Sequence, residues 1–202
     1  MNRSIVFFAT FLFVRLAVAQ GTFELVALNT GAGQPLISEM RTLLVDAALN
    51  QPRLLFKFGF ATEENPLPGE FLDSFTVSIQ DPSGTSTAVY LTADANGLVF
   101  APATPGTIAV DPATIFTSVI AYPSLQPLLP NQRAFQLSAP IPSQFSGGSV
   151  RVFFDLFDNL NPLASQAWFS DLQVVAVPEP RTVGMLIFGA LAFFWRFKRG
   201  TQ

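Results

Sequence analysis

Four oxygen-bearing side chains stand close together late in the chain. Asp155, Asp158, Asn159 and Asn161 form a D-x-x-D-N-x-N run at an expected strand end. Carboxylate and amide oxygens are the hard ligands that Ca²⁺ takes, at about 2.3–2.6 Å, and Asp171 on the next expected strand is an additional candidate. The alternative is an Asx turn, in which these side chains accept hydrogen bonds from their own backbone. The run therefore predicts either a calcium site or a polar turn.

A second acidic group could be interpreted as a glycosidase pair, which needs two carboxyls about 5–9.5 Å apart. Its members are Glu63, Glu64 and Asp73. Neighbours on a strand point to opposite faces, so Glu63 and Glu64 cannot serve one substrate if the strand continues there. The competing interpretation is a solvated loop. We expect no catalysis, and a secreted hydrolase is the least favoured function.

Absent residue types narrow the chemistry further. The 202 residues include no His and no Cys. This excludes disulfides, imidazole or thiolate metal sites, and a catalytic His or Cys within the chain. No Gly-rich phosphate loop and no G-x-S-x-G elbow occurs either. No cofactor is expected, apart from the calcium considered above.

The aromatic side chains of the chain could indicate a binding function, as opposed to a catalytic one. Trp168, Phe169, Tyr90 and Tyr122 could stack on sugar rings if they were exposed on a sheet. However, the chain has 22 Phe, and aromatic residues are chiefly core residues. A carbohydrate-binding module of an exopolysaccharide matrix, with or without calcium, is therefore an alternative to a purely structural role.

The middle of the chain alternates apolar and polar residues, which is typical of antiparallel strands with one wet face. The runs, with the residues expected to share a face, are Leu54–Thr62 (Phe56, Phe58, Phe60), Ser74–Gln80 (Phe75, Val77, Ile79), Ser149–Asp155 (Val150, Val152, Phe154) and Trp168–Ala176 (Trp168, Leu172, Val174, Ala176). Weaker runs are Thr22–Leu28, Ala88–Ala93, Ile115–Tyr122 and Ala134–Ser138. Together they predict an all-β fold class, a single jelly-roll-like antiparallel β-sandwich over residues 20–176.

One segment predicts a helix. Ser38–Leu49 has apolar residues at helical spacing, with Ser38 as a possible N-cap and Pro52 beyond its end. Leu43–Val45 could equally be a strand. We expect a short helix here.

The first 19 residues have the three parts of a secretory signal peptide. Arg3 is basic, Ile5–Val14 is an apolar run of ten, and Ala17 and Ala19 are small residues that suit a cleavage site after Ala19. Ten residues of helix cover about 15 Å, half of the hydrocarbon core of about 30 Å. We therefore expect a cleaved signal peptide, the alternative being an uncleaved N-terminal helix.

The other end carries a second apolar run. Thr182–Trp195 is 14 residues without a charge, and a basic tail over residues 196–202 with Arg196, Lys198 and Arg199 follows at once. An apolar helix that stops at a basic cluster predicts a membrane segment with its C-terminus in the cytoplasm. It would cover only about 21 Å, which requires snorkelling or local thinning of the bilayer. The alternative is a C-terminal core helix.

The charge of the expected exported part argues against polyanionic partners. Between Gln20 and Val177 there are 13 acids and five bases, a balance of −8. Such a domain is repelled by phosphate backbones and anionic lipid surfaces. We expect no nucleic-acid partner.

The tetrapeptide Val177–Pro180 precedes the apolar run, and its two prolines keep it extended. Pro178-Glu179-Pro180, a short apolar helix and a terminal basic cluster together resemble the PEP-CTERM sorting signal of Gram-negative bacteria. The resemblance covers residues 177–202. A short apolar run and the charge of Arg181 directly after the motif depart from the pattern.

The resemblance implies recognition of Pro178, Glu179 and Pro180 by an exosortase, temporary anchoring by Val183–Trp195, and retention by the basic tail. It implies export by the secretion machinery, a transient stay in the inner membrane, and delivery to the cell surface or extracellular matrix. The middle also looks like the β-sandwich ectodomains that often precede this signal. We expect a non-enzymatic exported protein in three parts: residues 1–19, 20–176 and 177–202.

Overall fold

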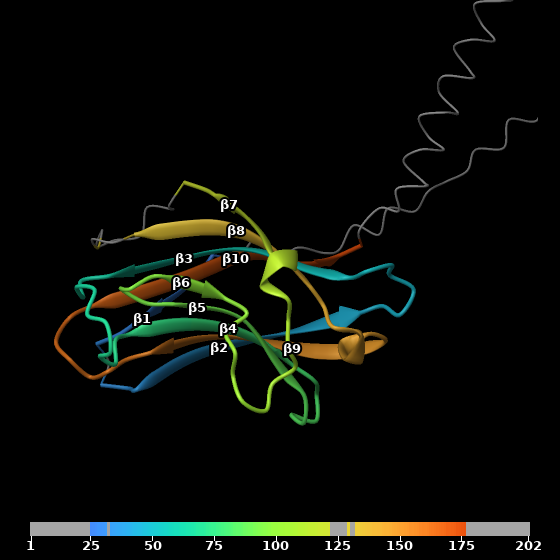
Figure 1. Ribbon diagram of the computed structural model, residues 1–202, viewed down its shortest axis with the longest axis horizontal. Helices are drawn as coiled ribbons and strands as arrows, with labels where there is room; N and C mark the ends of the chain where they lie inside the picture. The colour runs from blue at the N-terminus through green and yellow to red at the C-terminus, as the bar shows by residue number, and fades with distance from the viewer. Residues whose placement is uncertain (1–24, 32, 122–128, 130–131, 177–202) are drawn as a thin grey trace, which may run out of the picture.

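The described residues fold into two five-stranded antiparallel sheets that pack face to face as a sandwich (Figure 1). The computed structural model describes residues 25–31, 33–121, 129 and 132–176. The first sheet has the order β1-β10-β3-β8-β7 and the second has the order β2-β9-β4-β5-β6. The all-β prediction is confirmed for these residues. The strands are β1 Val26–Asn29, β2 Leu36–Val45, β3 Arg53–Thr62, β4 Ser74–Gln80, β5 Thr87–Ala93, β6 Leu98–Phe100, β7 Phe116–Val119, β8 Arg133–Pro140, β9 Gly148–Phe157 and β10 Ser165–Val175, with 3₁₀ turns at Pro112–Thr114 and Ser143–Phe145.

The core lies between the sheets and is built from the alternating residues of the central strands. Every residue that the pattern assigns to one face of β3, β4 and β9 is buried in one apolar cluster, as predicted. Phe154 of β9 and Phe169 of β10 join the two sheets, since their rings stack with centroids 3.6 Å apart and 2° between the planes. Phe56 meets Phe154 edge-on, with centroids 5.5 Å apart. Such contacts bury large apolar areas and supply most of the stabilisation.

The helix expected over Ser38–Leu49 is wrong, because Leu36–Val45 is the edge strand β2, paired with β9 along its whole length. Glu39 and Arg41 point inward at this open edge. Arg41 Nη1 donates to Glu39 Oε2 at 2.7 Å, and its guanidinium lies 5.5 Å from the ring centre of Phe169. Inward charges on an edge strand oppose pairing with another chain.

The predicted face of β10 is wrong at Trp168. A β-bulge interrupts the pairing with β3 between Ser170 and Gln173, and Asp171 adopts a left-handed conformation with φ of 55°. The extra residue reverses which side chains face inward. Phe169, Leu172 and Val174 belong to the core cluster, whereas Trp168 lies on the outer side of the sheet.

The strand register sorts the loops into two groups at opposite ends. At one end lies Val175, where β10 stops opposite Arg53, while β1 begins at Val26 opposite Phe169, partway along β10. The other end collects the β1–β2, β3–β4, β5–β6 and β9–β10 connections, on the left in Figure 1. The last described strand therefore stops at the end of the sandwich away from the loops that carry Glu64 and Asp158.

Candidate functional site

The β3–β4 and β9–β10 loops are tied together by a buried carboxylate, Glu64, which is 2% exposed. Its Oε1 accepts hydrogen bonds from Asn159 Nδ2 at 2.8 Å and from Asn161 Nδ2 at 2.6 Å. Its Oε2 accepts one from the backbone N–H of Asp73 at 2.8 Å. Hydrogen bonds to the ionised form satisfy a buried carboxylate. We call Glu64, Asp73, Asn159 and Asn161 the loop lock.

Two further buried acids hold the same loops. Asp73 Oδ1 accepts from the backbone N–H of Asn159 at 2.8 Å, while Oδ2 is buried with no donor among the described residues. Asp158 accepts from the backbone N–H of Leu160 at 2.6 Å and of Gly31 at 3.3 Å, which connects the β1–β2 loop. The contacts of Asp73 with Asn159 and of Asp158 with Gly31 cross long stretches of sequence, and no local pattern reveals them, whereas the contact of Asp158 with Leu160 is local.

The five residues considered for calcium lie in three places. Asp158, Asn159 and Asn161 are in the β9–β10 loop, and Asp155 is on the outer face of the second sheet. Asp171 is on the other sheet, where Lys57 Nζ lies 2.8 Å from its Oδ2. Strands β9 and β10 follow each other in sequence but belong to different sheets, so Asp155 and Asp171 point away from each other.

The contacts within the run are those of the polar-turn alternative. Asn159 Oδ1 accepts from the N–H of Asn161 at 3.0 Å, and Asn161 Oδ1 accepts from the N–H of Leu163 at 2.7 Å. With the bond from Leu160 to Asp158, these are Asx turns. Among the described residues, no three carboxylates gather into a group that could hold a metal ion. Calcium binding here stays a prediction.

The acids considered for glycoside hydrolysis have structural contacts. Glu63 is exposed, and its Oε2 accepts from the N–H of Ala164 at 3.0 Å. Glu64 and Asp73 are buried within the loop lock. Glu64 and Asp73 therefore do not form a pair of carboxyls that is open to a ligand.

The aromatic residues considered for sugar stacking are buried wherever the structure describes them. Trp168 and Phe169 are 2% exposed and Tyr90 is fully buried, with its hydroxyl donating to the carbonyl of Pro140 at 3.1 Å. Tyr122 lies outside the described residues. A sugar cannot stack on the three described rings.

A different surface carries partly exposed aromatic rings, and sequence reasoning missed it. It is the outer side of β2, β9, β4 and β5, which we call the β9 face. Because Val152, Phe154 and Leu156 face the core, Phe153, Asp155 and Phe157 between and after them face outward. The register aligns the outward residues in cross-strand rows: Leu36–Phe157–Ser74, Ser38–Asp155–Thr76–Thr92, Met40–Phe153–Ser78–Val89 and Thr42–Arg151–Gln80–Thr87.

The rows of the β9 face alternate in character, because two contain hydrophobic rings and two contain hydroxyl, amide or charged groups. In the central polar row, the hydroxyl of Ser38 donates to Asp155 Oδ1, and the hydroxyls of Thr76 and Thr92 share a hydrogen bond of 3.2 Å. Burial raises the pKa of Asp155, and the hydrogen bond from Ser38 partly opposes this effect. Carboxylates are usually fully exposed on a protein surface, so a half-buried one on the outer face of a sheet is unusual.

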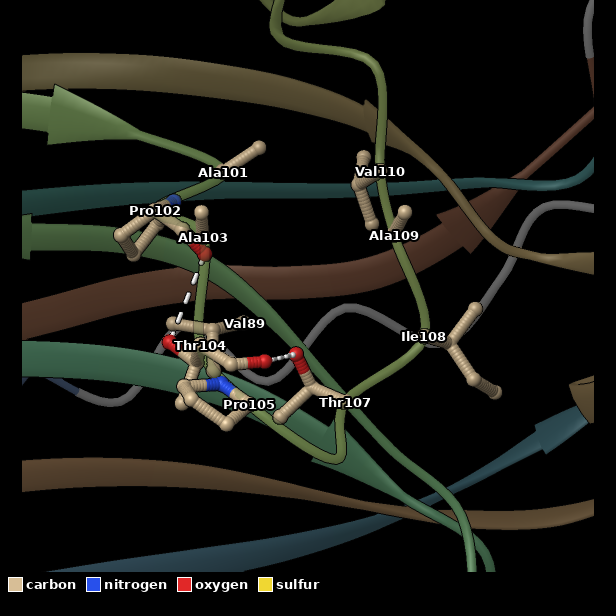
Figure 2. Close-up of a pocket in the computed structure, with 10 residues that line it drawn as sticks. All are labelled: Val89, Ala101, Pro102, Ala103, Thr104, Pro105, Thr107, Ile108, Ala109 and Val110. Carbon is tan, nitrogen blue, oxygen red and sulfur yellow. Dashed lines mark hydrogen bonds between the residues drawn. The ribbon is translucent and has the colours of Figure 1, made fainter.

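A cavity of about 510 Å³ adjoins the β9 face at β5 (Figure 2). Its floor includes Val89, and its walls are the two limbs of the loop over residues 101–110. Thr107 Oγ1 donates to the carbonyl of Thr104 at 2.8 Å, and the N–H of Ile108 donates to the carbonyl of Thr87 at 2.7 Å. The lining contains no charged residue, so the cavity suits uncharged groups.

In comparisons with known proteins, no family model and no curated protein matches the chain. The residues of the sorting hypothesis lie outside the described residues: Ala17, Ala19, Pro178, Glu179, Pro180, Arg196, Lys198 and Arg199. Within the part of the chain that the structure describes, no helix is long and apolar enough to cross a bilayer.

Proposed function

We propose that the protein is an exported, non-enzymatic surface protein whose C-terminal residues direct its anchoring and its processing by an exosortase. The observation that carries the proposal is the order of Pro178-Glu179-Pro180, an apolar run and a basic tail, together with the signal-peptide pattern of residues 1–19. The folded middle would then be an ectodomain with a structural role in the extracellular matrix.

The strand order supports classing this ectodomain as a jelly roll. If β6 and β7 are set aside as added edge strands, four strands remain in each sheet: β1, β10, β3 and β8 in one, and β2, β9, β4 and β5 in the other. Eight strands in two such sheets are the arrangement of jelly-roll folds.

The intact mass of the protein from each cell fraction tests the sorting proposal. We expect the mature protein to lack residues 1–19 and the basic tail, and to occur in envelope or extracellular fractions. A variant with both Pro178→Ala and Pro180→Ala should keep its C-terminus. The matched control changes Pro66 and Pro68, which form another Pro-x-Pro element in the exposed β3–β4 loop, and should be processed normally. A cytoplasmic protein with both termini intact would contradict the proposal.

The alternative function is a carbohydrate-binding module, and the partly exposed rings of the β9 face favour it. This alternative is compatible with export, because a matrix-bound protein needs both delivery and a ligand.

A further inference from the structure

We propose that the β9 face binds a neutral polysaccharide, with Phe153 and Phe157 as stacking platforms and Asp155 as a hydrogen-bond acceptor between them. The inference rests on the carbohydrate-binding alternative and deepens it by naming the surface and the ligand class. It does not depend on sorting by the C-terminus.

The rings set the size of the ligand. Phe153 and Phe157 are half-buried, lie on the same strand and face the same side. Four residues of strand separate them by about 13 Å. A sugar ring has an apolar face of C–H groups and can lie against an aromatic ring, as other apolar groups do. One ring cannot reach both platforms, so the surface selects an oligomer over a monosaccharide.

The row between the rings supplies directional contacts. Asp155 lies midway between Phe153 and Phe157 on β9, next to Ser38 on one side and Thr76 on the other. Ser38 is its hydrogen-bond donor among the described residues, and the second carboxylate oxygen can accept from ligand hydroxyls. Hydrogen bonds to a carboxylate are about twice as strong as neutral ones. Desolvation of Asp155 makes these contacts stronger still.

The charge of the surface selects a neutral ligand. Asp155 and Arg151 are the two charged residues within the four cross-strand rows, and their charges cancel. The wider exported part has a balance of −8 and repels polyanions at long range. A cationic peptide would find one carboxylate, with a guanidinium two rows away on the same strand. A neutral, hydroxyl-rich chain matches both the alternating rows and the absence of net charge.

The cavity extends this surface. The row through Met40, Phe153 and Ser78 ends at Val89, which is part of the floor of the cavity. An uncharged lining of Ala, Pro, Thr, Val and Ile continues the character of the row. The cavity therefore lies at the β5 end of the row that contains Phe153, to one side of a polysaccharide that lies along β9.

Native affinity electrophoresis of the full-length chain, in a detergent without a sugar headgroup, tests the proposal. The probes are four neutral polysaccharides (hydroxyethyl cellulose, amylose, xylan and galactomannan) and the polyanion alginate. We expect at least one neutral probe to retard the protein, while glucose, xylose, galactose and mannose do not compete at equal mass. Phe153→Ala and Phe157→Ala should each weaken retardation about tenfold.

Two further variants separate binding from folding. Phe153→Leu keeps an apolar side chain without a ring and should also weaken retardation. Phe116→Ala removes an exposed ring, 65% exposed, from the other sheet and should bind like the wild type. Three outcomes would each overturn the proposal. They are the failure of every neutral probe to retard the protein, equal retardation of Phe153→Ala and the wild type, and retardation by alginate alone at low salt. None of these outcomes alters the expected cleavage at the termini, so the sorting proposal stands or fails separately.

Discussion

The indole of Trp168 lies against the backbone of Gly59, so closely that a Cβ on Gly59 would stand 2.1 Å from its Nε1 and 2.5 Å from its Cε2. The two residues are cross-strand partners in β10 and β3. Only glycine leaves room for a large ring on this side of the sheet. The pair fixes the outer surface of the first sheet.

Gly59→Ala should destabilise the protein, because the added methyl group must displace the ring or the strand. Overpacking of this kind costs about 1–3 kcal/mol. Urea unfolding measures the change. The matched control is Gly148→Ala in β9, where an added Cβ meets no atom within 4 Å and φ is not left-handed. Equal stability of the two variants would contradict the close contact.

Glu64→Gln should destabilise the loop lock. The amide would turn an N–H group toward the donors of Asn159, Asn161 or Asp73, and leaving buried groups unpaired costs about 1–3 kcal/mol. Thermal unfolding checks the shift. Glu63→Gln makes the same chemical change one residue away, at an exposed side chain with a single backbone donor, and should have a much smaller effect. A larger loss from Glu63→Gln would show that the lock is misassigned.

The polar-turn alternative predicts a melting temperature that does not respond to calcium. The side-chain oxygens of Asp158, Asn159 and Asn161 already accept backbone N–H groups, so a cation would have to compete with them. The measurement compares melts in millimolar Ca²⁺ and in chelator. A higher melting temperature in Ca²⁺ would favour the calcium prediction, because a ligand of the native state stabilises it.

Two carboxylates should act oppositely on stability as the pH changes. Hydrogen bonds from Ser83 and Ser86, with Thr85, lower the pKa of Asp81 to about 2, against the opposing effect of desolvation. Its stabilisation is present above the unfolded pKa of about 3.9 and is lost as the pH falls toward 2. Asp81→Asn should therefore lower the melting temperature at pH 7 and converge with the wild type near pH 2. If the melting temperatures of the variant and the wild type still differed near pH 2, Asp81 would not be the cap of the β4–β5 turn.

Asp155 has the reverse sign, because burial raises its pKa. The folded state holds the proton more tightly, so stability falls as the pH rises from the unfolded pKa through the folded one. Asp155→Asn should raise the melting temperature at pH 7 and bring no gain at pH 3. Binding surfaces often carry such a cost in stability. An equal gain at both pH values would show that desolvated charge is not the cause.

The sequence analysis succeeds where one face of a strand is apolar and the other polar. The phenylalanines of β3 alternate with smaller or polar residues, and their inward direction was predictable. The β2 prediction failed because both faces mix types: Glu39 and Arg41 point inward, while Met40 and Leu44 point outward. Apolar residues on both faces imitate helical spacing.

The candidate sites were harder to predict because they depend on contacts distant in sequence. The loop lock joins Glu64 to Asn161, 97 positions away, across strands of different sheets. The bulge at Asp171 moved Trp168 out of the expected face, and no local residue pattern marks that change. The β9 face could not be predicted because its rings are next to core residues in the sequence. Phe153 and Phe154 together look like part of one apolar run, although they point to opposite faces.

The last described strand, β10, stops at the end of the sandwich opposite the loop lock, and this fixes how a tethered molecule would be oriented. If the residues after Val175 hold the protein to a surface, the strand axes point away from that surface. The loop lock around Glu64 is then the part of the sandwich farthest from the attachment. The cross-strand rows then run parallel to the supporting surface. A polysaccharide that contacts both Phe153 and Phe157 lies along β9 instead, so it would run away from that surface and not along it.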